Sequence, residues 1–136
     1  MTQEEILEYN KRCAEFLNFK YRNSKKAWGK YPLDNNSFLA LKGWLSMDRL
    51  QFHSDWNWIM EVVEAIEKNK FLIDKERPYY ITIDNNYCGI FFNRWNDKGK
   101  DFGGTKQIVS IKADSKKEAV VQAINQFLIW YNENNT

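Results

Sequence analysis

The segment from Ser115 to Tyr131 constrains the fold more than any other part of the chain. Ser115 and Glu118 stand at the spacing of a capping box, in which each side chain accepts a hydrogen bond from the other residue's backbone amide. Apolar residues then recur at three- and four-residue steps, namely Val120, Ala123, Ile124, Phe127, Leu128 and Tyr131. This period predicts an amphipathic helix over 115–131, which becomes stable when its apolar stripe packs on another element.

Two further helices are predicted by the same signals. Thr2 and Glu5 form another capping box, and the apolar stripe behind them predicts a helix that ends near Phe19. Ser54 or Asp55 is suited to accept hydrogen bonds from free amides at the start of a later helix of about four turns. The apolar stripe of that later helix consists of Trp56, Ile59, Met60, Val63 and Ile66.

Strand-forming residues are concentrated between the second and third predicted helices. Residues 79–83 and 87–92 are rich in aromatic and β-branched side chains, and the residues 84–86 between them favour a turn, so a hairpin is predicted. Residues 107–111 predict a third strand, after an exposed loop over 93–104. Residues 22–53 are irregular, and their pattern is compatible with one or two short strands or turns. The predicted class is α+β, with helices packed on one face of a small antiparallel sheet in the order α-α-β-β-β-α.

Composition indicates a single globular domain spanning residues 1–136. The chain is 43% hydrophobic and 16% aromatic, which is too apolar for a disordered protein. No apolar run approaches the roughly 18 residues that a membrane helix needs. Cys13 and Cys88 are far apart in the sequence, which favours a reduced, cytoplasmic setting. The net charge of +2 is too small to mark the whole chain as a nucleic-acid binder.

The residues with catalytic potential do not form a recognisable set. His53, Ser54 and Asp55 include the residue types of a hydrolase triad, but consecutive residues cannot normally aim their side chains into that relay. One histidine and two distant cysteines provide no standard metal-ligand spacing, so neither a metal nor a cofactor is predicted. A small nucleotide hydrolase remains a weaker alternative, in which carboxylates meet through the tertiary fold: Glu61, Glu64, Asp84 and Asp97.

A basic aromatic segment, residues 19–31, provides the first candidate binding surface. It contains no acidic residue, and its cations alternate with Tyr21, Trp28 and Tyr31. Cations can neutralise phosphates while aromatic rings stack on bases, and the same patch suits an acidic protein surface or a protein that carries RNA. In the alternative interpretation, the aromatic rings pack into the core and the lysines face solvent.

Arg94 and Trp95 provide a second candidate surface. They lie in the polar stretch NRWNDKGKDFGG, where an exposed tryptophan beside an arginine is typical of protein interfaces. The alternative is a tryptophan that covers one end of the sheet.

Two segments carry a resemblance to a known group of proteins. FHSDWNWIMEVVEAIEK and KKEAVVQAINQFLIWYNEN resemble small proteins encoded by phages and prophages of Bacteroidetes, with matches at His53 through Glu67 and Glu118 through Tyr131. The AEFL stretch at Ala14 to Leu17 fits as well. The group has no established active site, so the resemblance implies only a context. That context is a phage accessory protein in the cytoplasm of a host bacterial cell, and such proteins often bind and block a host machine.

The leading hypothesis is therefore a non-enzymatic phage-type accessory protein that binds a bacterial protein or ribonucleoprotein, including the case of an anti-CRISPR or other anti-defence inhibitor. The alternative is a nucleic-acid-binding protein that uses residues 19–31. No membrane partner is expected. The predicted contact residues are Lys20, Arg22, Lys25, Lys26, Trp28, Lys30, Tyr31, Arg94 and Trp95.

Overall fold

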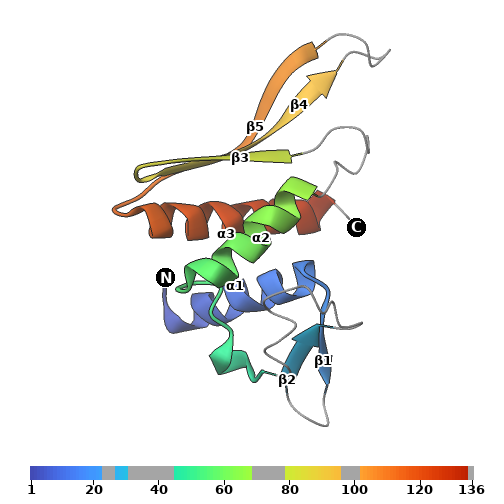
Figure 1. The fold of residues 1–136 in the computed structure, drawn as a ribbon, viewed down its shortest axis with the longest axis vertical. Helices are drawn as coiled ribbons and strands as arrows, with labels where there is room; N and C mark the ends of the chain where they lie inside the picture. Colours follow the sequence, from blue (N-terminus) through green and yellow to red (C-terminus); the bar gives the residue numbers. More distant parts are fainter. Residues whose placement is uncertain (23–26, 31–44, 69–78, 96–101, 135–136) are drawn as a thin grey trace. The chain divides into compact units, whose positions relative to one another are not determined.

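The computed structural model describes residues 1–22, 27–30, 45–68, 79–95 and 102–134 (Figure 1). The prediction of an α+β protein is confirmed, since the helices and the larger sheet follow one another as α-α-β-β-β-α. The elements are α1 (Gln3–Phe16), β1 (Phe19–Arg22), β2 (Ala27–Lys30), the short 3-10 helix η2 (Met47–Arg49), α2 (Trp56–Lys68), β3 (Tyr79–Asp84), β4 (Tyr87–Trp95), β5 (Phe102–Lys112) and α3 (Lys116–Asn134).

The chain divides into two compact units, Met1–Val62 and Val63–Thr136, and α2 runs through the boundary. The expectation of a single domain remains a prediction.

The first unit begins with a capped helix. The hydroxyl of Thr2 accepts a hydrogen bond from the amide of Glu5 at 3.1 Å, and the Glu5 carboxylate accepts one from the Thr2 amide at 3.2 Å, so the predicted capping box is present. The helix ends at Phe16, earlier than the predicted end near Phe19. Asn18 has a φ of 64°, and this left-handed conformation, which asparagine tolerates better than most residues, turns the chain into β1.

The strands β1 and β2 form a two-stranded antiparallel hairpin in the first unit. Phe19 pairs with Lys30 and Tyr21 pairs with Trp28. On its other edge, Trp28 exchanges two backbone hydrogen bonds with Leu45, with N to O distances of 2.6 and 2.8 Å. Strand β2 is thus one of the short strands considered for residues 22–53, and it is held from both sides.

Aromatic rings fill much of the core of the first unit. Phe52 is fully buried and makes edge-to-face contacts with Phe19, at a centroid distance of 6.1 Å, and with Trp58, at 4.9 Å. Such pairs add about 0.5–1.5 kcal/mol each beyond the burial of their area. These contacts connect the hairpin, the segment before α2 and the first turn of α2.

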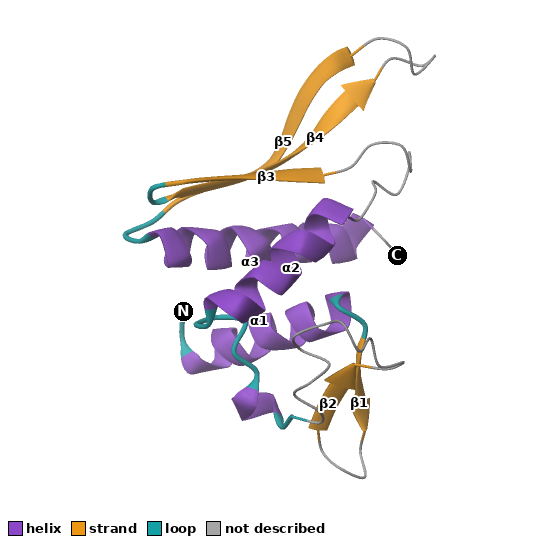
Figure 2. Ribbon diagram, in the orientation of Figure 1, coloured by secondary structure: helices purple, strands orange, loops and turns teal. Residues whose placement is uncertain are grey.

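In the second unit, α3 packs along one face of the antiparallel sheet β3-β4-β5 (Figure 2). Tyr79 of β3 makes edge-to-face contacts with Phe127, at 5.0 Å, and with Trp130, at 6.3 Å, both on α3. At the start of α3, the Ser115 hydroxyl accepts a hydrogen bond from the amide of Glu118 at 3.2 Å, as the capping motif predicts. The helix continues to Asn134, beyond the predicted end at Tyr131.

The prediction of an exposed loop over residues 93–104 is wrong at both of its ends. Strand β4 continues to Trp95 and β5 begins at Phe102, with Asn93 paired to Thr105 and Trp95 paired to Phe102. Glycine-rich and polar residues have low strand propensity, but strand pairing depends strongly on context, and a partner strand supplies the backbone hydrogen bonds.

Candidate functional site

The residues around His53 are the most suggestive catalytic group in the sequence, and the structure gives them other roles. A carboxylate oxygen of Asp55 accepts a hydrogen bond from the amide of Asn57 at 2.8 Å, at the start of α2. The backbone amide of Ser54 donates to the carbonyl of Gln51 at 3.2 Å, and the Ser54 side chain is exposed. Asp55 therefore satisfies a free amide at a helix start, as predicted.

His53 is held by Asn10 of α1. The amide nitrogen of Asn10 lies 3.1 Å from Nδ1 of His53 and also donates to the carbonyl of Leu50 at 3.0 Å. Because this amide group is a donor, Nδ1 acts as the acceptor, which places the hydrogen of a neutral ring on Nε2. Burial lowers the pKa of His53, which also favours the neutral form of the ring. The arrangement favours a neutral structural histidine.

A neighbouring residue strengthens the same attachment. The hydroxyl of Tyr9 donates to the carbonyl of Phe52 at 3.0 Å, in a buried position. We call the three hydrogen bonds from Tyr9 and Asn10 to residues 50–53 the α1 clamp. The sequence does not reveal these contacts, because 43 positions separate Tyr9 from Phe52 and Asn10 from His53, and no local pattern reports partners so far apart.

The two cysteines are buried as well. Burial raises the pKa of Cys88 to about 11, and it raises the pKa of Cys13 further. A thiol is a nucleophile or metal ligand in its thiolate form, so raised pKa values favour packing roles for both side chains. Within the described ranges, no group of three or more His, Cys, Asp or Glu side chains is placed to hold a metal ion.

The carboxylates of the hydrolase alternative are only partly described. Glu64 on α2 and Asp84 at the end of β3 are exposed, and Glu61 is half-buried on α2. Asp97 lies outside the described residues. The exposure of Glu64 agrees with a solvated helix face.

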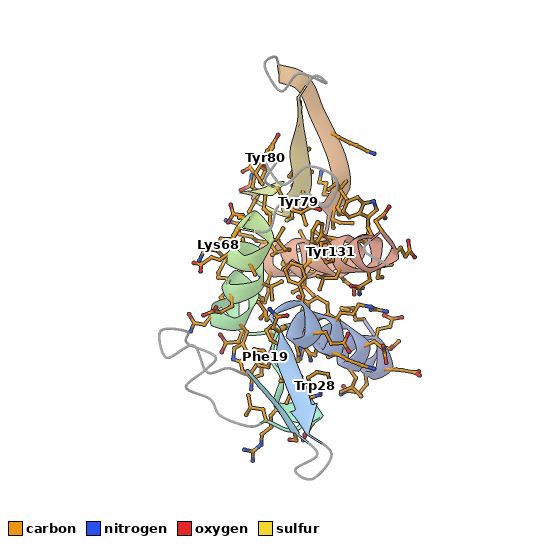
Figure 3. All side chains as sticks on the ribbon, turned by 90° about the vertical axis from the view of Figure 1, so that its right-hand side faces the viewer. Phe19, Trp28, Lys68, Tyr79, Tyr80 and Tyr131 are labelled. Carbon is orange, nitrogen blue, oxygen red and sulfur yellow. The ribbon has the colours of Figure 1, made fainter. Side chains whose placement is uncertain are left out.

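The predicted contact residues of the basic aromatic segment lie on the β1–β2 hairpin. Lys20 and Arg22 are in β1 and Lys30 is in β2, whereas Lys25, Lys26 and Tyr31 lie outside the described residues. Phe19 and Trp28, both labelled in Figure 3, are buried residues. They are 3% and 6% exposed, so the structure favours the alternative in which the Trp28 ring packs in the core. These two residues fix both strands of the hairpin.

The strand register separates the basic positions of β1 from the buried ones. Lys20 pairs with Gly29 and Arg22 pairs with Ala27, whereas the buried Phe19 occupies the alternate pleat position. Lys20 and Arg22 are therefore alternate positions of β1, two residues apart, and both are paired to small residues.

Arg94 and Trp95 lie in strand β4, not in a loop. The expected loop setting of this second candidate surface is therefore wrong, and the two residues belong to the extended end of the β4–β5 pair. They lie in the second unit, whereas the hairpin lies in the first.

None of the described helices is long and apolar enough to cross a membrane. Comparison with protein-family models, with curated proteins and with solved structures finds no match to this chain.

Proposed function

We propose that this chain is a non-enzymatic accessory protein that binds a bacterial protein or ribonucleoprotein through the β1–β2 hairpin. One observation carries the proposal: the basic positions Lys20 and Arg22 lie on a strand whose neighbouring residue Phe19 and cross-strand residue Trp28 are buried anchors. A surface that is already ordered loses less conformational entropy when it binds a partner. An anchored hairpin is therefore a suitable contact element.

The charge of the hairpin indicates the chemistry of the partner surface. Lys20, Arg22 and Lys30 are accompanied by no acidic residue anywhere in residues 19–31. A local excess of cations attracts an acidic surface, accelerates association and makes binding sensitive to salt. The targets that fit include the acidic surfaces of host defence complexes, so an anti-CRISPR or other anti-defence inhibitor is the finer form of the proposal.

The roles of the polar residues support binding rather than catalysis. Thr2, Asp55 and Ser115 accept hydrogen bonds from amides at helix starts, and His53 accepts one from Asn10. Each of these groups contributes to local structure in a way that needs no substrate.

A capture experiment tests the proposal. Tagged wild-type protein, a Lys20→Glu/Arg22→Glu/Lys30→Glu variant and a control are incubated with lysate of the bacterial host, and bound proteins are identified by mass spectrometry. The control is Lys11→Glu/Lys68→Glu/Lys116→Glu, which makes the same charge change at exposed positions on the three helices. Wild type and control should recover the same protein, and the hairpin variant should not.

Two results would contradict this proposal. Equal recovery by all three proteins would remove the hairpin from the interface. Loss of DNA or RNA retention in a shift assay by the hairpin variant, with no protein captured, would replace the proposal with direct nucleic-acid binding, whose affinity should fall steeply with salt.

A further inference from the structure

The face of the β3-β4-β5 sheet that lies opposite α3 carries a layer of aromatic rings. Tyr79 contacts Phe127 of α3, and the next residue, Tyr80, lies on the other side of the sheet (Figure 3). Strand pairing extends this side across all three strands. We call it the outer face. The residues of this face that pair across all three strands form three rows: Tyr80, Phe91 and Gln107; Thr82, Gly89 and Ser110; Asp84, Tyr87 and Lys112.

The aromatic side chains of the outer face pack against one another and over the backbone of β4. The rings of Tyr80 and Phe91 are stacked, with centroids 5.2 Å apart and an interplanar angle of 19°. A Cβ atom at Gly89 would lie only 2.6 Å from the Phe91 ring and would also meet the Tyr87 hydroxyl. Glycine at this position therefore allows both side chains to close over the backbone of β4. The result is a continuous, half-buried aromatic layer.

Small polar groups surround this layer. Thr82, Ser110 and Gln107 are exposed and present two hydroxyls and an amide, which can each donate and accept hydrogen bonds. The charged residues of the three rows are Asp84 and Lys112, both exposed and in the same row, so their charges cancel. The three rows of the outer face thus combine half-buried aromatic rings with hydrogen-bonding groups and carry no net charge.

We propose that the outer face is a binding site for a neutral glycan. A pyranose ring has an apolar C–H face that packs on an aromatic ring and a rim of hydroxyls that need donors and acceptors. Tyr80, Phe91 and Tyr87 provide the aromatic surface. The hydroxyls of the sugar are matched by the polar groups at the edges of that surface: Thr82, Asp84, Gln107, Ser110 and Lys112.

The charge and the ring spacing disfavour two other ligands. A nucleic-acid strand requires an excess of cations for its phosphates, whereas Lys112 is balanced by Asp84 in its own row. A proline-rich peptide inserts its rings between separated aromatic side chains, whereas Tyr80 and Phe91 are stacked on each other and leave no slot between them. A neutral polyhydroxylated ligand fits both observations.

This site is independent of the proposed hairpin function. All of its residues belong to the unit Val63–Thr136, whereas the hairpin belongs to Met1–Val62. Failure of one proposal therefore leaves the other standing.

The test is a titration of the full-length, isotope-labelled protein followed by amide resonances. The probes are maltohexaose, cellohexaose, chitohexaose and mannohexaose at millimolar concentration, with oligo-dT and a proline-rich peptide in parallel. At least one oligosaccharide should shift the resonances of residues 80–84 and 87–91. Tyr80→Ala should weaken that binding about tenfold, since it removes one aromatic contact.

Tyr80→Ala also removes the stack with Phe91 and lowers stability, so a second variant is needed. Ser110→Arg adds a long charged side chain at an exposed position in the middle row and leaves the aromatic rings in place. It should abolish the shifts, whereas Ser54→Arg, the same change at an exposed position in the other unit, should preserve them. The proposal is overturned if no oligosaccharide shifts these resonances, if the shifts persist in Ser110→Arg, or if only oligo-dT or the peptide produces them.

Discussion

Replacing Asn10 by alanine probes the α1 clamp in the first unit. Asn10 is 1% exposed, and its amide nitrogen donates to the Leu50 carbonyl and contacts Nδ1 of His53. The alanine variant leaves the Leu50 carbonyl without this donor, in a buried position. It also removes the Asn10 side-chain oxygen, which is buried and has no hydrogen-bond partner within the described part of the chain.

The expected magnitude follows from these opposing effects. A buried acceptor that is left unsatisfied lowers the free energy of unfolding by about 1–3 kcal/mol. Loss of the hydrogen bond to His53 lowers it by only about 1 kcal/mol, because His53 is half-buried and water can take the place of Asn10. Removal of the unpaired Asn10 oxygen raises the free energy of unfolding by about 1 kcal/mol, because a buried polar atom without a partner is destabilising. Asn10→Ala should therefore reduce the free energy of unfolding by about 2 kcal/mol, which lowers the urea midpoint by about 1 M.

Urea unfolding followed by tryptophan fluorescence measures this loss, because Trp58 is buried against Phe52 next to the clamp. Asn132→Ala makes the same chemical change at an exposed position of α3 and should alter stability by less than about 0.5 kcal/mol. A double-mutant cycle that combines Asn10→Ala with His53→Ala should give a coupling energy of about 1 kcal/mol. An Asn10→Ala variant as stable as Asn132→Ala would refute the structural role assigned to Asn10 and His53.

Other predictions concern pH, packing and capping. The pKa of His53 is lowered from 6.5 in the folded state, so below that pH the unfolded chain binds more protons than the folded chain. The free energy of unfolding should therefore be constant at neutral pH and fall towards about pH 5. His53→Leu should flatten this dependence in unfolding curves measured across that range. Gly89→Ala should lower the free energy of unfolding by about 1–3 kcal/mol, because its methyl group would displace the Phe91 ring. A thermal melt that matched wild type would contradict this close packing. Ser115→Ala should lower the free energy of unfolding by about 1 kcal/mol through loss of the α3 cap. The loss should be smaller in Ser115→Asp, which retains an acceptor, and equal losses in both variants would argue against capping.

Local signals in the sequence predicted the helix starts and the central hairpin. Thr2, Asp55 and Ser115 act on amides two or three residues away, so their roles can be read from nearby sequence. The turn before β4 was also predictable, and Asn85 in this turn has a φ of 50°. These features need no tertiary information.

Features that depend on distant residues were not predicted. The continuation of β4 and β5 requires pairing across residues 96–101, and the α1 clamp joins residues separated by 40 positions or more. Two local signals do predict features of this fold. Asn18 is the type of residue that ends a helix with a positive φ, so it indicates the end of α1. The alternation along β3 and β4 indicates that Tyr80 and Phe91 lie on the same face of the sheet.

The most direct measurement of the proposed function is quantitative capture from host lysate at increasing salt. Binding through the hairpin predicts that one protein or ribonucleoprotein is enriched by wild type and by Lys11→Glu/Lys68→Glu/Lys116→Glu. The recovery of this partner should fall as salt screens the hairpin cations, and Lys20→Glu/Arg22→Glu/Lys30→Glu should recover none. Recovery of the same partner by the hairpin variant, with no dependence on salt, would contradict it.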